Sequence, residues 1–197
     1  MSPSCLDVRR AILAADPLFH TSMDPYEQYQ AGTEADYTSL PDRRSLTMAS
    51  RQYATFEVAD QLFGLDVAKV QEVLSFDQYT PVPLAPESVG GLFNLRGQVI
   101  AAVDLRVQLG LPPRTKSAEP AMNVIVKTDE ESVSLLVDRI GEVVTLQEDT
   151  FEPPPDTLQG RARQLITGAF KLDGRLLLAL DTQKAVNTNP PGTNREE

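Results

Sequence analysis

Hydrophobic and polar residues alternate along much of the chain after residue 51, which is the pattern of β-strands with one buried face. The first two alternating runs lie at residues 54–58 and 63–67, and the polar pair Asp60-Gln61 lies between them. Two such runs joined by a short polar segment predict a β-hairpin.

The spacing of apolar residues changes after this hairpin. Val67, Val70 and Leu74 recur at steps of three and four residues, so we predict a short helical turn there rather than a third strand. The prolines of residues 81–86 exclude a central strand and predict an extended connector. Residues 88–94 are predicted to form a brief helix.

A nearly continuous apolar run, Gln98 to Val103, then predicts a strand that is buried on both faces. Asp104 is suited to cap a short helix over residues 105–109, which Gly110 would close. Further strands are predicted at residues 123–127 and 132–138. The acidic triplet of residues 129–131 between them is interpreted as a solvated hairpin turn, because the residues and spacing of a calcium loop are missing.

The last third of the chain begins with a proline-rich connector near residues 151–164. Asp173-Gly174 lies between two apolar runs and predicts another hairpin, followed by a buried strand at residues 176–180. A last helix is expected near Asp181. Many short strands, frequent turn signals and little helix indicate an all-β protein made of small barrels or a sandwich. A parallel sheet is not expected, because strands and helices do not alternate along the chain.

Both ends of the chain differ from this strand-rich part. Residues 1–51 are mostly polar and are interpreted as a largely disordered extension, with a short helix possible only at residues 6–15. An ordered docking arm is the alternative for this segment. A chain that started at Met48 would lead directly into the first strand. Residues 187–197 have the composition of a disordered tail.

The composition and net charge narrow the classes of function. The 197 residues carry a formal net charge of −10, which disfavours nucleic acid and anionic membranes as partners. The single cysteine, Cys5, can form neither an internal disulfide nor a cysteine-based zinc site. No stretch approaches the ~18 apolar residues of a membrane helix, and the N-terminus lacks a secretory signal. We therefore expect a cytoplasmic protein that is not inserted in a membrane.

Motifs of catalysis and cofactor binding are missing. The sequence contains no glycine-rich phosphate loop and no nucleophile elbow, and its single histidine, His20, lies in the polar extension. One histidine is too few for the usual zinc site. A serine–histidine or cysteine–histidine pair would have to use His20, whose position in the polar extension is interpreted as incidental. We therefore expect no enzyme activity, no catalytic residues, no cofactor and no metal, and interpret the chain as a binding protein. A pair of catalytic carboxylates remains the alternative, because acidic residues are numerous.

Four segments together resemble the CheW family, the coupling adaptors of bacterial chemotaxis. They are FGLDVAKVQEVL, TPVPLAPESVGGLFNLRGQVIAAVDLR, LLVDRIGEVVTL and LITGAFKLDGRLLLALD, in the family's order and spacing, and the similarity covers residues 52–186. It implies two intertwined, SH3-like, five-stranded β-barrels with a few short helices. It also implies a non-enzymatic adaptor that couples the signalling tip of methyl-accepting chemoreceptors to the regulatory domain of the CheA histidine kinase, at receptor arrays on the inner membrane face. Contacts with other CheW-like domains in array rings are left open.

The resemblance also implies a receptor-binding groove. Arg96 of the NLRG motif and Glu72 of the KVQE motif are expected to approach each other across it, and Gly97 is expected to let the backbone turn into the next strand. Val70, Val99 and Val143 would supply its apolar part, with Asn123 at its margin. The alternatives are that the three valines belong to the core and that Arg96 is an ordinary surface arginine at a strand end.

Other interpretations of the same residues stay open. The adaptor could serve a non-flagellar chemosensory system, such as twitching motility or gene regulation. An enzyme or a small-ligand binder on the same barrels would need a closed pocket with convergent polar groups. A fragment of a larger kinase would fit the family as well, but the chain has no ATP-binding motif. Ala101 departs from the proline that family members often carry in this strand.

Overall fold

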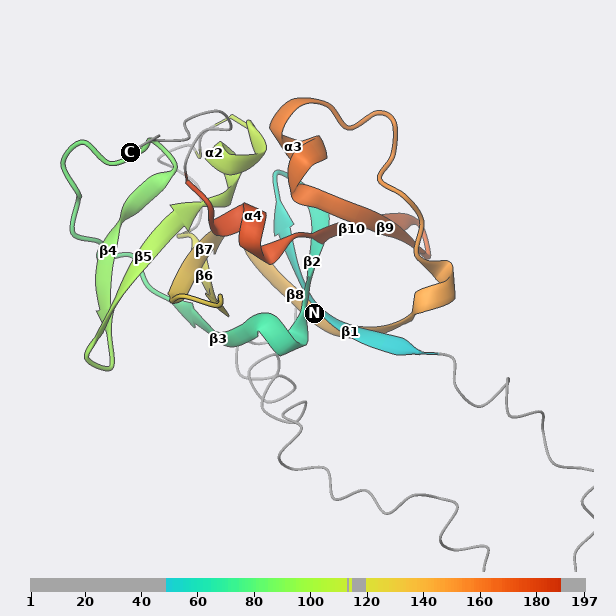
Figure 1. Ribbon diagram of the computed structural model, residues 1–197, viewed down its shortest axis with the longest axis horizontal. Coiled ribbons are helices and arrows are strands. Elements are labelled where there is room, and N and C mark those ends of the chain that lie inside the picture. The colour runs from blue at the N-terminus through green and yellow to red at the C-terminus, as the bar shows by residue number, and fades with distance from the viewer. Residues whose placement is uncertain (1–48, 113, 115–119, 189–197) are drawn as a thin grey trace, which may run out of the picture.

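The computed structural model describes residues 49–112, 114 and 120–188, and the predictions for residues 1–48 and for the tail from residue 189 lie outside this part. Ten strands in this part of the chain form two five-stranded sheets (Figure 1). Sheet A has the order β8 (Arg139–Gln147), β1 (Ser50–Val58), β2 (Gln61–Asp66), β10 (Arg175–Leu180) and β9 (Ile166–Leu172). Sheet B has the order β3 (Val70–Ser75), β6 (Met122–Lys127), β7 (Ser132–Val137), β5 (Gln98–Asp104) and β4 (Val89–Leu95).

Short helices connect these strands. They are the 3₁₀ turns η4 (Val67–Lys69) and η5 (Glu148–Thr150) and the α-helices α2 (Leu105–Leu109), α3 (Gly160–Leu165) and α4 (Thr182–Val186). Asp104 caps α2 as predicted, accepting a hydrogen bond from the Arg106 amide at 2.8 Å. The described part of the chain is therefore all-β with two five-stranded units and a few short helices, which confirms the predicted fold class.

Two predicted elements were wrong, and a third was missed. Residues 88–94 form most of strand β4 rather than a helix, and the predicted helical turn after Val67 is only η4, followed by β3. Gly91 makes the path of β4 possible, because its φ is +140° and a side chain there would meet the Thr80 carbonyl oxygen at 2.8 Å. Helix α3 lies inside the predicted connector. Pairing with neighbouring strands decided β3 and β4, because such pairing outweighs local propensity.

One hydrophobic core is shared by both sheets. It includes Phe56 and Leu65 from sheet A and Val103 and Leu135 from sheet B, all almost completely buried. The other face of each sheet covers a smaller cluster, around Phe170 in sheet A and around Phe93, Ile100 and nearby residues in sheet B. Strands such as β6, β7 and β10 are thus buried on both faces over four or more consecutive residues, which explains the continuous apolar runs in the sequence.

The two sheets repeat one topology within the chain. In each sheet, an edge strand with a β-bulge pairs with the first strand of a central hairpin. The second strand of that hairpin pairs in parallel with the second strand of another hairpin. The loop of this other hairpin has two residues. Sheet B follows this plan with β3, β6, β7, β5 and β4, and sheet A follows it with β8, β1, β2, β10 and β9. The parallel pairs β2–β10 and β5–β7, which the sequence did not suggest, arise because two hairpins join edge to edge in each sheet.

The matching positions extend to single residues. Isolated bridges join Thr80 to Leu92 in sheet B and Glu152 to Ala169 in sheet A, and each closes the gap beside an edge strand. Asp104 and Asp181 cap the helices that follow the two matching strands, β5 and β10.

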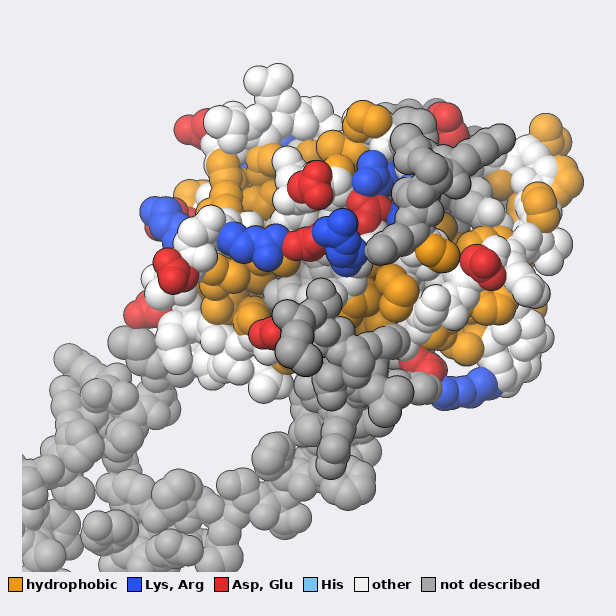
Figure 2. All heavy atoms as spheres, turned by 180° about the vertical axis from the view of Figure 1, so that it is seen from behind, with side chains coloured by type: hydrophobic (Ala, Val, Ile, Leu, Met, Phe, Trp, Pro, Cys, Tyr) orange, Lys and Arg blue, Asp and Glu red, His pale blue; other side chains and the backbone are white. Residues whose placement is uncertain are grey.

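On the rear face, Lys and Arg side chains mix with Asp and Glu side chains in a band between hydrophobic areas (Figure 2).

Candidate functional site

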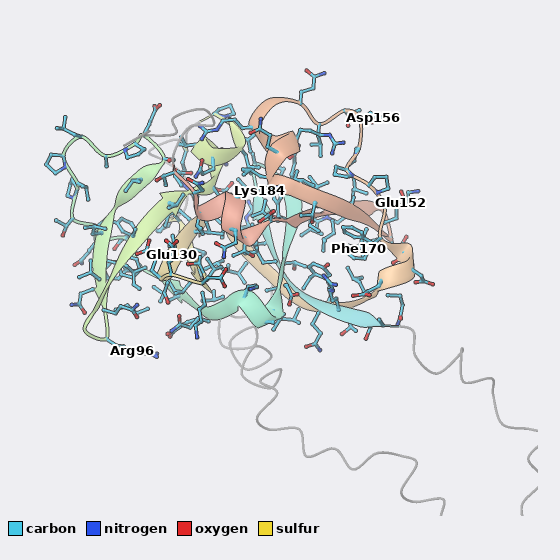
Figure 3. The ribbon with its side chains drawn as sticks, in the orientation of Figure 1. Arg96, Glu130, Glu152, Asp156, Phe170 and Lys184 are labelled. Atoms are coloured by element: carbon cyan, nitrogen blue, oxygen red, sulfur yellow. The ribbon has the colours of Figure 1, made fainter. Side chains whose placement is uncertain are left out.

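Arg96 lies at the tip of the β4–β5 hairpin, at one end of sheet B (Figure 3). Its Nη2 donates to Glu72 Oε1 on β3 at 2.8 Å, so the two residues approach each other as the family resemblance implied. The two partners differ sharply, because 69% of the arginine side chain is exposed and only 9% of the glutamate side chain is. Glu72 therefore holds a guanidinium whose outer face remains open to a partner.

The backbone at this tip is strained for an arginine. Arg96 and Gly97 have φ values of +53° and +90°, and they are the two central residues of the hairpin loop. Asparagine and glycine are the favoured residues at such positions, and other residues cost about 1 kcal/mol there. Asn94 Oδ1 accepts from the Gly97 amide at 2.8 Å and supports the turn. An arginine at a position suited to asparagine indicates a use other than stability.

The structure distributes the predicted groove residues over different environments. Val99 is 64% exposed on the same hairpin as Arg96, which leaves it available for an apolar contact. Val70 is buried in the shared core, and Val143 is half-buried against that core on β8 of sheet A. The alternative that these valines are core residues holds for Val70 and in part for Val143.

Asn123 does not lie at the margin of a groove, which corrects the sequence prediction. It is completely buried, donates through Nδ2 to the Phe76 carbonyl at 2.9 Å, and accepts from the Ser134 hydroxyl at 2.9 Å. A buried amide with its hydrogen bonds made fixes neighbouring backbone segments. Asn123 thus attaches the connector after β3 to the centre of sheet B.

We expect Asn123→Leu to lower the free energy of unfolding by about 2 kcal/mol, because buried polar groups at Phe76 and Ser134 lose their partner. Urea unfolding measures this change. Ser132→Ala, which removes an exposed hydroxyl bonded to Gln71, is the control and should change stability little. A stable Asn123→Leu variant with weakened receptor binding would show that Asn123 belongs to the interface after all.

Arg106 and Asp138 form a second charged cluster, which the sequence did not reveal. Arg106 Nε donates to Asp138 Oδ1 at 3.0 Å, Arg114 Nη2 lies 2.6 Å from the same oxygen, and the Ala59 amide donates to Oδ2 at 2.8 Å. All three charged side chains are less than one-fifth exposed. The cluster joins α2 of sheet B to the β1–β2 turn of sheet A, so its role is to hold the two sheets together.

Among the described residues, the carboxyl groups of Glu57 and Asp138 have lowered pKa values. Burial opposes ionisation of Asp138, but hydrogen bonds from Arg106 and the Ala59 amide, together with the charge of Arg114, outweigh it and lower its pKa. The hydrogen bond from Arg175, against an opposing effect of burial, lowers the pKa of Glu57. Both groups therefore bind a proton less readily in the folded chain than in the unfolded chain.

This difference predicts a loss of stability in acid. The unfolded chain takes up protons first, so the free energy of unfolding should fall as the pH drops below the ordinary values of 4.5 for Glu57 and 3.8 for Asp138. Urea unfolding at several pH values between about 6 and about 3 measures this slope. The double variant Glu57→Gln/Asp138→Asn should show a shallower slope than the unchanged chain. An equal slope in both proteins would contradict the assignment.

Comparison with known proteins gives the family. Residues 52–189 match the model of the CheW-like domain. The chemotaxis protein CheW of Rhizobium meliloti is 30% identical over 141 residues, which cover 70% of this chain and 88% of that protein. The CheW of Thermotoga maritima is 29% identical over 132 residues, covering 67% and 85% of the two chains. A crystal structure of the scaffolding protein TtCheW from Thermoanaerobacter tengcongensis matches with a TM-score of 0.60 and 31% identity, over 66% of this chain and 88% of that one.

This chain belongs to the CheW-like domain family. The predicted class of function, a chemotaxis adaptor, is thereby confirmed, and the relatives are described as chemotaxis and scaffolding proteins. Within the described residues, no helix is long and apolar enough to cross a membrane. No group of three or more His, Cys, Asp or Glu side chains in that same part is arranged to hold a metal ion.

Proposed function

We propose that this chain bridges the signalling tip of a methyl-accepting chemoreceptor and the regulatory domain of a CheA-type histidine kinase. It contributes no chemistry of its own, and it works in the cytoplasm at receptor arrays on the inner membrane face. The observation that carries the proposal is the exposed, strained Arg96 at a hairpin tip, held by the buried Glu72 in a CheW-like domain.

The receptor tip would contact the surface around the β4–β5 hairpin. Arg96, Glu72, Gly97 and Val99 supply a fixed cation, its counter-ion, the turn and an exposed apolar side chain. Arginine is enriched at the centre of protein interfaces, because its planar guanidinium pairs with carboxylates while its stem covers apolar surface. Receptor tips are helical hairpins, so recognition would place a helix against this surface.

A bridging assay tests the proposal. A receptor-tip fragment is immobilised, and the kinase regulatory domain from the same organism is passed over it with and without this chain. We expect the kinase domain to be retained only when the chain is present. Retention that does not depend on the chain, or no retention in either case, would contradict the bridging function.

A further inference from the structure

Sheet A has an aromatic hollow with a volume of about 190 Å³. Tyr53 of β1, Phe170 of β9 and Phe151, which follows η5, supply its aromatic lining. The centroid of the Phe170 ring lies 5.1 Å from that of Tyr53 and 5.0 Å from that of Phe151. The ion pair between Arg51 and Glu148 forms the remaining wall. A hollow of this size holds one large side chain rather than a helix, whose diameter with side chains is about 10–12 Å.

Phe151 stays on the surface although the backbone around it is fixed. It is 40% exposed and is one of only five exposed large hydrophobic residues in the described part of the chain. The next residue, Glu152, exchanges two backbone hydrogen bonds with Ala169 at 2.9 Å each. A Cβ at Gly168 would collide with the Phe151 ring, so this glycine leaves the space in which the ring lies over β9. The exposed ring is therefore held in place by sheet A.

The N-terminal segment of the chain, residues 1–48, joins β1 at the rim of this hollow. The Ala49 carbonyl accepts a hydrogen bond from the amide of Glu148, which lines the hollow, at 2.9 Å. β1 accordingly begins beside η5 (Figure 1). Leu40 lies nine residues before Ala49, and nine extended residues span at most about 30 Å. The last part of the N-terminal segment is therefore long enough to reach the hollow.

The rim of the hollow is acidic. Glu148 and Glu152 each pair with one basic side chain at 2.7 Å. Asp149, next to Glu148 in η5, is exposed and forms no ion pair with another residue in the described ranges. The rim thus retains a carboxylate that is available to a cation.

One part of the N-terminal segment matches both features of the hollow. Because Arg51 and Tyr53 line the hollow, the chain before Ala49 has to reverse its direction to enter it, and Leu46 is too close to Ala49 for such a reversal. Leu40 is the next large aliphatic residue towards the N-terminus. The arginine pair at positions 43 and 44 follows it and suits an acidic rim with an exposed aromatic ring.

We propose that residues 37–46 dock onto sheet A of the same chain, with the Leu40 side chain in the aromatic hollow and Arg43 and Arg44 against its acidic rim. A short linker gives an attached segment an effective concentration in the millimolar range, so a contact with a Kd of about 0.1 mM keeps the hollow about 90% occupied. The N-terminal segment then covers a surface of sheet A. This inference does not depend on the proposed adaptor function.

Amide hydrogen exchange of the full chain tests the docking. We expect the amides of residues 37–46 to exchange about tenfold more slowly in the unchanged chain than in Phe151→Ala, as the occupancy of the hollow requires. Leu176→Ala is the matched control, because Leu176 is 39% exposed on β10 of the same sheet and lies outside the hollow. Phe151 packs on Phe170, so Leu40→Ser provides a second test that leaves the described core unchanged, and it should abolish the slow exchange as well.

The two arginine pairs of the N-terminal segment test the charge and the choice of occupant. Arg43→Gln/Arg44→Gln should speed the exchange of residues 37–46 at least about threefold at low salt, and high salt should reduce this difference. Arg9→Gln/Arg10→Gln removes the same charge from a more distant position and should leave the exchange unchanged.

Four results would overturn the inference. Equal exchange of residues 37–46 in the unchanged chain and in Leu40→Ser would show that the segment makes no such contact. Slow exchange that survives Phe151→Ala would place the segment on another surface. An effect of the distant arginine pair alone would assign the hollow to the helix predicted at residues 6–15. Slow exchange that is lost when the protein is diluted would make a second copy of the chain the source of the contact.

Discussion

Replacing Arg96 with asparagine is expected to abolish most receptor-tip binding without lowering stability. Asparagine is favoured at a position with positive φ, so the gain in backbone energy offsets the loss of the ion pair with Glu72. The arginine of this pair is 69% exposed, and ion pairs open to solvent contribute only about 0–1 kcal/mol. Loss of an arginine at the centre of an interface costs about 2 kcal/mol of binding energy, or roughly thirtyfold in affinity. Calorimetry with a receptor-tip fragment measures the affinity, and thermal unfolding measures the stability.

A second surface arginine provides the control for Arg96. Arg51 is 56% exposed and pairs with Glu148 at 2.7 Å at the start of β1. Arg51→Asn removes the same charge and a similar ion pair, and it should leave receptor binding unchanged. Unchanged receptor binding in Arg96→Asn would remove the main support for the docking surface. A large loss of stability in that variant would instead make Arg96 a structural residue.

Asp138→Ala is expected to destabilise the fold by about 3 kcal/mol, because removing one partner leaves buried charges without compensation. Arg106 and Arg114 would lie close together without the carboxylate between them, and the Ala59 amide would lose its acceptor. Urea unfolding measures the loss, which should exceed the loss caused by Asn123→Leu. The contact between the two sheets would weaken first, since the cluster joins them.

Glu148→Ala is the control for this prediction. Its carboxylate also pairs with an arginine, but both side chains are largely exposed, so its removal should cost less than about 1 kcal/mol. A similar small cost in Asp138→Ala would mean that the cluster is solvated in solution and does not hold the sheets together.

Much of the fold follows from local sequence patterns. Alternation identifies the β1–β2 hairpin, the continuous run at residues 98–103 identifies the doubly buried β5, and Asp104 marks the start of α2. These features depend on neighbouring residues only. Strand β4 is missed although its partner β5 is the next strand in the chain, because the two glycines of β4 hide the alternation of apolar residues. The internal repeat is visible as Phe-x-Leu-x-Gly in residues 93–97 and 170–174, but only the matching registers give it meaning.

The candidate site is predictable to a smaller extent. The approach of Arg96 to Glu72 follows from the resemblance to the CheW family, and the structure reproduces it. The burial of Asn123 could not be inferred, since an asparagine in a strand is usually exposed and its partners are distant in sequence. Arg106 and Asp138 are 32 residues apart, and nothing local shows that they meet.

Calorimetry of the full chain with its two proposed partners tests the central claim most directly. The receptor-tip fragment and the kinase regulatory domain are taken from the same organism and titrated separately, then the second is titrated into the complex of the first. We expect binding to each partner and undiminished binding of the second to the preformed complex. Binding of only one partner at a time, or of neither by a chain that unfolds cooperatively, would contradict a bridge.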